Sequence, residues 1–333
     1  MSPRTIYRKT FGFVALQLLL QILFTLLAVG LLYLIYLLAA KTTLKYTALA
    51  AILLWALLTF IAAPIVNRFG SYLLRAGHVA AVAKYVQDQK QPDHVLKFGI
   101  NQVKKRFPVA TSYFFVHNLV DGAVRQLQKV LLTSVGDISF VAGLGAVNNA
   151  VHAFMKVAVG KIDDCCLAYT FLHPKQGAVQ SSCDGVVIYA ANWQPLMKQA
   201  AKTFGWTVAI TVILVLIPFA VAFVGFFVLK SHSIWMIPAL LIAAYLATAF
   251  KHAVVDSYSM VRMIVQYYDC SKDVKLNQEY YDDMSRLSGK FKKLYYAAKK
   301  EQKERREQKK KLYEETETIK PDGNVIWHQD KQP

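Results

Sequence analysis

The stretch that decides the fold is Phe11–Ala40, which reads FGFVALQLLLQILFTLLAVGLLYLIYLLAA and contains no charged residue. A helix needs about 20 mostly apolar residues to cross a bilayer core of about 30 Å. Hydrocarbon offers no hydrogen-bond partner to the backbone, so a segment that crosses it must be helical. The stretch exceeds the apolar part of a cleaved secretory signal, which is about 7–15 residues long. We therefore predict a membrane-spanning helix that the chain retains.

Three further blocks have the same character. Tyr46–Asn67, Thr203–Leu229 and Ser231–Phe250 also lack Asp, Glu, Lys and Arg. Buried helices of a soluble core are usually shorter and interrupted by polar residues. The chain has 333 residues, of which 55% are hydrophobic, and its excess of apolar residues lies in these blocks. The sequence predicts an all-α, polytopic integral membrane protein with four clear transmembrane helices in two hairpins, and with amphipathic or re-entrant helices between them.

The distribution of basic residues predicts the orientation in the membrane. The net charge is +18, and the cations cluster at the N-terminus, between Arg68 and Arg106, and in the C-terminal tail. The connections within the two hairpins carry only Lys41 and Lys45, and Lys230. Because Lys and Arg near span ends stay in the cytoplasm, we expect both termini to be cytoplasmic. Nothing in the sequence identifies the membrane.

These signals divide the chain into six parts. We expect a cytoplasmic N-terminus at 1–10, a first hairpin at 11–67, a helical region at 68–202, a second hairpin at 203–255, a basic cytoplasmic helical tail at 256–317 and a disordered C-terminus at 318–333. Within the tail, a stretch rich in Lys and Arg begins at Lys290, and its basic residues are candidate contacts for anionic lipid headgroups. The alternative for this stretch is a solvated helix with internal ion pairs. These candidates are Lys290, Lys292, Lys293, Lys299, Lys300, Arg305 and Arg306.

The central region, 68–202, leaves three interpretations open. It begins and ends on the cytoplasmic side, so it crosses the membrane twice or not at all. The apolar segments 107–120 and 138–155 are marginal in length for spans. Asp121, Arg125 and Lys129 share one helical face, as an amphipathic helix would have them. The segments are therefore interfacial or re-entrant helices, two true spans, or parts of a soluble subdomain. We also expect an amphipathic helix over Ser181–Lys202.

Polar side chains at membrane depth mark a candidate path or helix interface. Such groups are costly in lipid unless they are used. The candidates are Gln17, Gln21, Asn148, Asn149, His152 and Asp256. The alternatives are hydrogen bonds between helices for the glutamines, an interfacial polar face for Asn148 and His152, and a pairing of Asp256 with Lys251 or Arg262.

No motif for catalysis, cofactor binding or metal binding is recognisable. The chain contains no Gly-rich phosphate loop, nucleophile elbow or zinc-protease motif, so we expect no enzyme activity and no cofactor. Asp163, Asp164 and Cys165 lie near two further cysteines and a histidine, but the spacing matches no standard zinc pattern. The four cysteines do not form the regular framework of a disulfide scaffold. We expect no nucleic-acid partner, because no binding module accompanies the basic tail.

The C-terminal half resembles the choline transporter-like family. Ile237–Asp269 (IPALLIAAYLATAFKHAVVDSYSMVRMIVQYYD) is similar to the last span of that family, and Asp256 and Asp269 match its acidic positions. Cys165–Ala191 resembles the amphipathic segment before a span, and Arg75–Val79 resembles a Gly-Val motif. The family has about ten spans and a cysteine-rich loop, whereas this chain has four predicted spans and no such loop. The resemblance therefore implies a transporter-like character but carries no choline site over.

Two functional hypotheses follow. The first is a transporter-like or channel-like assembly for a small solute; since four spans enclose little aqueous volume, it implies a homo-oligomer. The second is a non-transporting scaffold or membrane-remodelling protein that binds anionic lipid through its amphipathic segments and basic tail.

Overall fold

The computed structural model describes residues 2–39, 47–65, 72–90, 92, 94–107, 110–134, 162–227 and 236–318, and every regular element in these ranges is helical. In chain order the helices are α1 (Pro3–Lys9), α2 (Phe11–Ala39), α3 (Thr47–Ile65), α4 (Tyr72–Asp88), α5 (Val95–Arg106), α6 (Ala110–Ser134), α8 (Ala178–Ala191), α9 (Trp193–Phe227), α10 (Met236–Phe250), the π-helix η3 (Lys251–Asp256), α11 (Ser257–Ser271), α12 (Gln278–Leu287) and α13 (Gly289–Thr318). Residues 162–172 are also helical.

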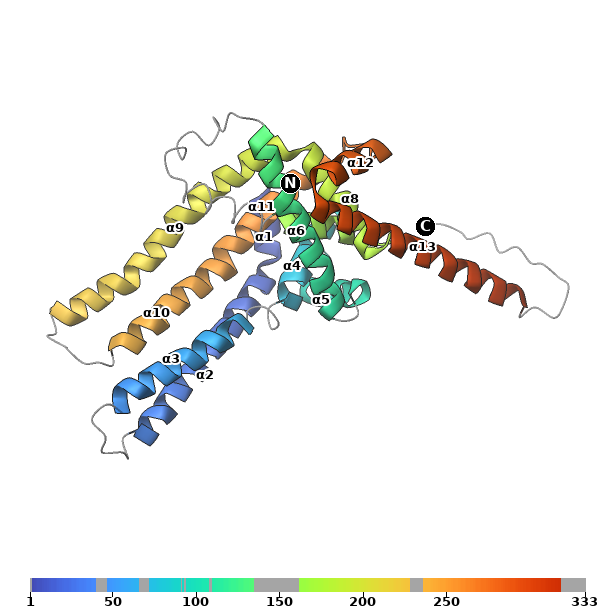
Figure 1. Cartoon of the computed structure of the whole chain (residues 1–333). Helices are drawn as coiled ribbons and strands as arrows, with labels where there is room; N and C mark the ends of the chain where they lie inside the picture. The colour runs from blue at the N-terminus through green and yellow to red at the C-terminus, as the bar shows by residue number, and fades with distance from the viewer. Residues whose placement is uncertain are drawn as a thin grey trace.

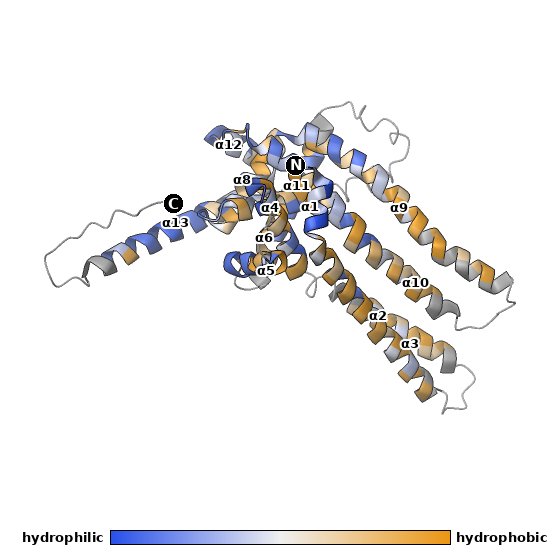
Figure 2. Ribbon diagram, turned by 180° about the vertical axis from the view of Figure 1, so that it is seen from behind, coloured by the Kyte–Doolittle hydropathy of each residue, from blue (hydrophilic) through white to orange (hydrophobic). Residues whose placement is uncertain are grey.

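The helices form two parts. The long apolar helices α2, α3, α9 and α10 project together from one side of a helical domain (Figure 1), and hydrophobic residues colour them along most of their length (Figure 2). Within this arm, α2 packs against α3 and α10, and α10 packs against α9. The remaining helices gather at the base of the arm, where α4, α6, α8 and α11 surround a common core.

Two of the described helical stretches are long and apolar enough to cross a membrane: Phe11–Ile35 and Leu240–Ser271. Leu49–Ala62 is a shorter apolar helix of the same kind. In an apolar 18-residue window of each stretch, only 17% and 22% of the residues are buried within the protein. Side chains such as Leu27 and Phe60 are 65% and 77% exposed. Exposed apolar surface on this scale is unusual for a soluble monomer, so the arm is suited to a lipid environment.

The core of the helical domain contains the first of the two marginal segments. Val116, Val120 and Val124 of α6 are almost completely buried, together with side chains of α4, α8, α11 and α13. This burial favours the soluble-subdomain interpretation of 107–120, because the apolar face of α6 packs on protein. The second marginal segment, 138–155, lies outside the described residues.

One predicted helix was wrong in its bounds. The expected amphipathic helix Ser181–Lys202 is divided, since α8 ends at Ala191 and α9 begins at Trp193 and continues into the apolar arm. Asn192 separates them, and its side-chain amide donates a hydrogen bond to the carbonyl of Cys270. α10, η3 and α11 follow one another without interruption across residue 256, and the start of the cytoplasmic tail at that residue stays a prediction.

The arm is joined to the domain where α4 and α5 meet the beginning of α2. Gly77 of α4 and Gly99 of α5 face each other so closely that a Cβ on Gly99 would overlap the carbonyl of Gly77. The ring of Phe13, in the first turn of α2, lies against both glycines and is itself buried. The absence of two side chains therefore allows three helices to meet at one point.

Candidate functional site: a polar cavity at the base of the apolar arm

A polar cavity of about 340 Å³ lies where the apolar arm meets the helical domain. Its walls come from six elements: α2, α4, α6, η3, α11 and the helix 162–172. The lining residues are Gln17, Gln21, Tyr72, Arg75, His78, Tyr113, Phe114, His117, Asn118, Asp164, His252, Asp256, Ser257 and Met260. A cavity with this many titratable and amide groups, at the end of long apolar helices, is the strongest candidate for a functional site.

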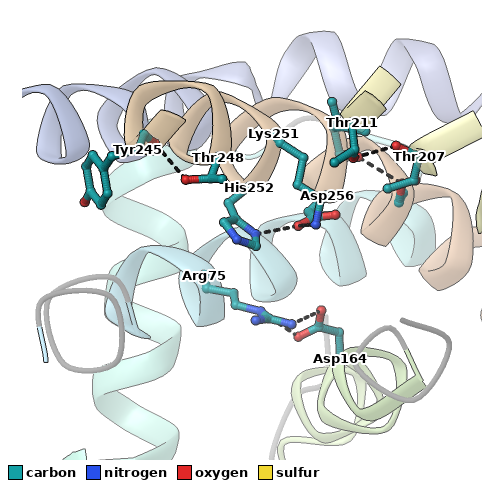
Figure 3. A network of polar contacts seen from close by, with 11 residues as sticks. Arg75, Asp164, Thr207, Thr211, Tyr245, Thr248, Lys251, His252 and Asp256 are labelled. Atoms are coloured by element: carbon teal, nitrogen blue, oxygen red, sulfur yellow. Dashed lines mark hydrogen bonds and ion pairs between the residues drawn. The ribbon is translucent and has the colours of Figure 1, made fainter. Parts of the chain in front are cut away.

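The π-helix η3 supplies the carboxylate on the arm side of the cavity. Asp256 accepts hydrogen bonds from Lys251 Nζ at 3.0 Å and from His252 Nδ1 at 2.7 Å (Figure 3). In a π-helix the backbone hydrogen bonds join residues i and i+5, so Lys251 and Asp256 lie on the same face of η3. His252 precedes Asp256 by four residues, and its ring contacts the same carboxylate. Single π-helical turns within α-helices are frequent at functional sites.

The domain side of the cavity is organised by an ion pair between Arg75 of α4 and Asp164. Arg75 Nε and Nη2 donate to Asp164 Oδ1 and Oδ2 at 3.1 and 2.8 Å, which is a bidentate arrangement (Figure 3). The Asp164 side chain is only 1% exposed, and its negative charge raises the pKa of Arg75. Arg75 therefore stays charged, and its planar guanidinium holds the buried carboxylate in one orientation.

Asp163, next in the chain, faces the other way and contacts a histidine. Its Oδ2 lies 3.4 Å from Nδ1 of His117 on α6, and its Oδ1 accepts a hydrogen bond from the backbone N–H of Asp164 at 2.8 Å. Burial and the negative charge of Asp164 raise the pKa of Asp163 to about 6, although His117 and Arg75 act in the opposite direction. This carboxyl group can therefore exchange a proton near neutral pH.

A second histidine connects the cavity to the start of the arm. The hydroxyl of Thr10 donates to the carbonyl of Ile6 at 3.0 Å, so it accepts a hydrogen bond from His78 Nε2 at 2.9 Å. The proton of neutral His78 is thereby assigned to Nε2. Burial lowers the pKa of His78 to about 4, so the ring is uncharged at neutral pH.

The structure brings together three of the six predicted polar residues. Gln17, Gln21 and Asp256 line the same cavity, although they lie at opposite ends of the chain. Gln21 also accepts a hydrogen bond from the hydroxyl of Tyr245, so it links α2 to α10 as the alternative interpretation expected. Asp256 pairs with Lys251, again as that alternative expected. Asn148, Asn149 and His152 lie outside the described residues.

Among the lining residues that were not predicted from the sequence, five have a charged or imidazole side chain: Arg75, His78, His117, Asp164 and His252. The signal for His252 was available, because it precedes Asp256 by one helical turn. Asp164 was considered only as a metal ligand, and among the described residues no group of three or more His, Cys, Asp or Glu is placed to hold a metal ion. Arg75 and His78 lie one turn apart on α4, and His117 belongs to α6. Nothing in the local sequence of either helix indicates that the two helices meet at one cavity.

The basic residues of α13 are far from this cavity. The first turns of α13 pack on α6 and α8 through Phe291, Leu294 and Ala298, which are buried. Beyond them the helix extends on the side of the domain opposite the apolar arm, as both ribbon views show (Figures 1 and 2). Lys300 and Lys303 each lie 3.9 Å from a glutamate one turn later. These two pairs are of the kind that the solvated-helix alternative expects, and the contact of this run with lipid headgroups stays a prediction.

The raised pKa of Asp163 predicts a pH-dependent stability. A carboxyl group whose folded-state pKa lies above its unfolded value of 3.8 destabilises the fold when it is ionised. Asp163→Asn should therefore stabilise the protein at pH 7.5, by on the order of 2 kcal/mol. The gain should shrink as the pH falls below 6 and vanish only below about pH 3, where Asp163 is protonated in both the folded and the unfolded state. Thermal unfolding of both proteins in detergent across this pH range measures the difference in stability. If the variant were less stable than the wild type at pH 7.5, the contact of Asp163 with His117 would outweigh the cost of burying its charge.

Comparison with protein-family models, with curated proteins and with solved structures gave no match for this chain.

Proposed function

We propose that this protein is a four-span membrane protein that transfers a small polar solute across the bilayer, and that the cavity is its cytoplasmic solute-binding site. The observation that carries the proposal is the convergence of Gln17 and Gln21 of α2 with His252 and Asp256 of η3 in one cavity. Amide, imidazole and carboxylate groups at the end of apolar helices are costly, and in membrane proteins they mark substrate and ion pathways.

The four-span topology rests on four apolar helices that project together. α2 and the α10–α11 stretch have the required length and apolar character. α3 returns beside α2 as the second member of its hairpin. The middle of α9 exposes Ile213, Leu216 and Phe223, at 57%, 59% and 63%. The basic helices α1 and α5 at the base of the arm support a cytoplasmic position of the domain and of both termini.

The transfer path requires more than one chain. Gln21 and Tyr245 join α2 to α10 directly, so these two helices do not separate around an aqueous channel. We propose a homo-oligomer in which arms of neighbouring chains complete the path from the cavity to the opposite side. The resemblance to the choline transporter-like family agrees with a transporter-like character but remains an expectation.

The test is permeation through proteoliposomes. Purified protein is reconstituted into vesicles, and osmotic swelling with glycerol or urea and current across planar bilayers are recorded. Wild-type vesicles should exceed empty vesicles in at least one assay. Asp256→Asn should reduce that permeation by about tenfold, since it removes the charge that orders Lys251 and His252. Lys309→Gln on exposed α13 is the matched control and should not change it. The proposal is contradicted if wild-type protein inserts into the vesicles but gives no more permeation than empty vesicles in either assay.

A non-transporting, lipid-binding scaffold is the second candidate. It is favoured by α5, whose lysines Lys97, Lys104 and Lys105 are exposed beside the beginning of α2. This hypothesis expects no permeation together with binding to anionic vesicles that weakens as salt is raised.

A further inference from the structure

Two short helices at the base of the arm expose cations on the protein surface. α1 immediately precedes α2, and α5 packs against α4 and the beginning of α2. The exposed cations are Arg4, Arg8 and Lys9 of α1 and Lys97, Lys104 and Lys105 of α5. Neither helix contains Asp or Glu. Among the described residues, none of the six cations has an ion-pair partner within 4.0 Å.

The packing fixes the level of α5 along the first apolar helix. Leu96 of α5 lies against Gly12, where a Cβ would be 3.4 Å from the leucine Cγ, and Gly99 lies against Phe13. Gly12 and Phe13 belong to the first turn of α2. α5 therefore lies beside the point at which the apolar helix begins, and it packs closely against α4 where Gly99 meets Gly77.

The exposed face of α5 points away from the protein. Lys97, Asn101, Lys104 and Lys105 follow one another at helical spacing and are all exposed, whereas Gly99 and Val103 on the opposite face are buried. α1 ends in Arg8 and Lys9, directly before the apolar residues of α2. Cations thus lie on two helices at the level where the first apolar helix would enter the headgroup layer.

We propose that α1 and α5 form a cationic collar around the first span that binds the phosphate groups of anionic membrane lipids. The inference rests on the proposed function in one respect, namely that α2 crosses the bilayer. Each Lys or Arg near a charged leaflet is attracted to it, and the attraction decays within a Debye length, so only cations at headgroup level contribute. The collar meets this condition. The distal part of α13 extends on the other side of the domain, and glutamates are interleaved with its cations.

The test compares two triple variants of the full chain with equal loss of charge. Lys97→Gln, Lys104→Gln and Lys105→Gln are combined in one protein, and Lys309→Gln, Lys310→Gln and Lys311→Gln in the other. All six lysines are exposed, so neither set disturbs the core. Each protein is placed in nanodiscs of phosphatidylcholine alone or with phosphatidylglycerol, and its thermal unfolding is measured.

Phosphatidylglycerol should raise the Tm of the wild type. The α5 variant should lose about half of that increase, because three of the six collar cations are removed. The α13 variant should retain all of it, and inorganic phosphate added to phosphatidylcholine nanodiscs should not reproduce it. Equal losses in both variants, or no effect of phosphatidylglycerol on the wild type, overturn the collar. These readouts are independent of permeation, so failure of the transport assay leaves them standing, whereas failure to insert into the nanodisc contradicts the four-span topology itself.

Discussion

Arg75→Ala is expected to lower the free energy of unfolding by about 3 kcal/mol, because it leaves the carboxylate of Asp164 buried without its partner. Asp164 is 1% exposed, so its charge depends on the guanidinium for stabilisation, whereas Arg75 itself is 45% exposed and would be solvated after the reverse change. Chemical or thermal unfolding of the detergent-solubilised protein measures the loss. Asp164→Asn should cost less, since it removes the buried charge together with the pair.

The matched control is another Arg–Asp pair of the same chain. Arg125 donates from Nε to both carboxylate oxygens of Asp121 at 2.8 Å, but its side chain is 53% exposed. Surface pairs of this kind contribute about 0–1 kcal/mol, so Arg125→Ala should have a small effect. Combining Arg75→Ala with Asp164→Asn should recover part of the loss. If Arg75→Ala and Arg125→Ala lower the free energy of unfolding equally, the ion pair between Arg75 and Asp164 does not order the cavity wall.

Gly99→Ala is the substitution for which the largest loss is expected. The new methyl group would overlap the carbonyl of Gly77 and would lie 2.6 Å from Cζ of Phe13. Both obstacles belong to helix backbone or to a buried ring, so α5 has to move off α4. We expect a loss of about 3 kcal/mol or more, with lower expression of folded protein. Size-exclusion profiles and thermal unfolding in detergent check this result.

The same substitution at Gly205 is the control. A Cβ at Gly205 in α9 meets nothing within 4 Å, so Gly205→Ala adds a methyl group without a clash. Alanine is favoured over glycine in a helix interior, so the change should be neutral or should stabilise by less than about 1 kcal/mol. Similar losses in both variants would indicate that the contact between α4 and α5 does not join the arm to the domain.

Much of the apolar arm could be predicted from the sequence, whereas the cavity could not. The free-energy cost of placing an uncharged run such as Phe11–Ala40 in lipid is low whatever its neighbours are. The composition of one sequence window therefore suffices to predict such a helix. Gln17, Gln21 and Asp256 were found for the same reason, because a polar group in or beside such a run stands out. Arg75 and His117 belong to helices of mixed composition, in which a charged or polar residue is ordinary.

The segment 107–120 shows where composition reaches its limit. A short apolar run can face lipid, a headgroup layer or a protein core, and its hydropathy is the same in all three cases. The burial of Val120 and Val124 against other helices favours the core, and that burial depends on partners from α4, α8 and α11.

The sequence by itself determined that the chain is helical, that its apolar helices are suited to a bilayer, and which polar residues lie at their ends. Transfer of a segment from water to lipid depends on the residues of that segment alone, so these properties are local. Only the tertiary structure decided that Arg75 meets Asp164, that Asp163 contacts His117, and that Arg75, Asp164 and His117 line one cavity with η3. An ion pair depends on the distance between two charges, and here that distance is set by helices that are separated along the chain and brought together by the core and by the contact of Gly77 with Gly99.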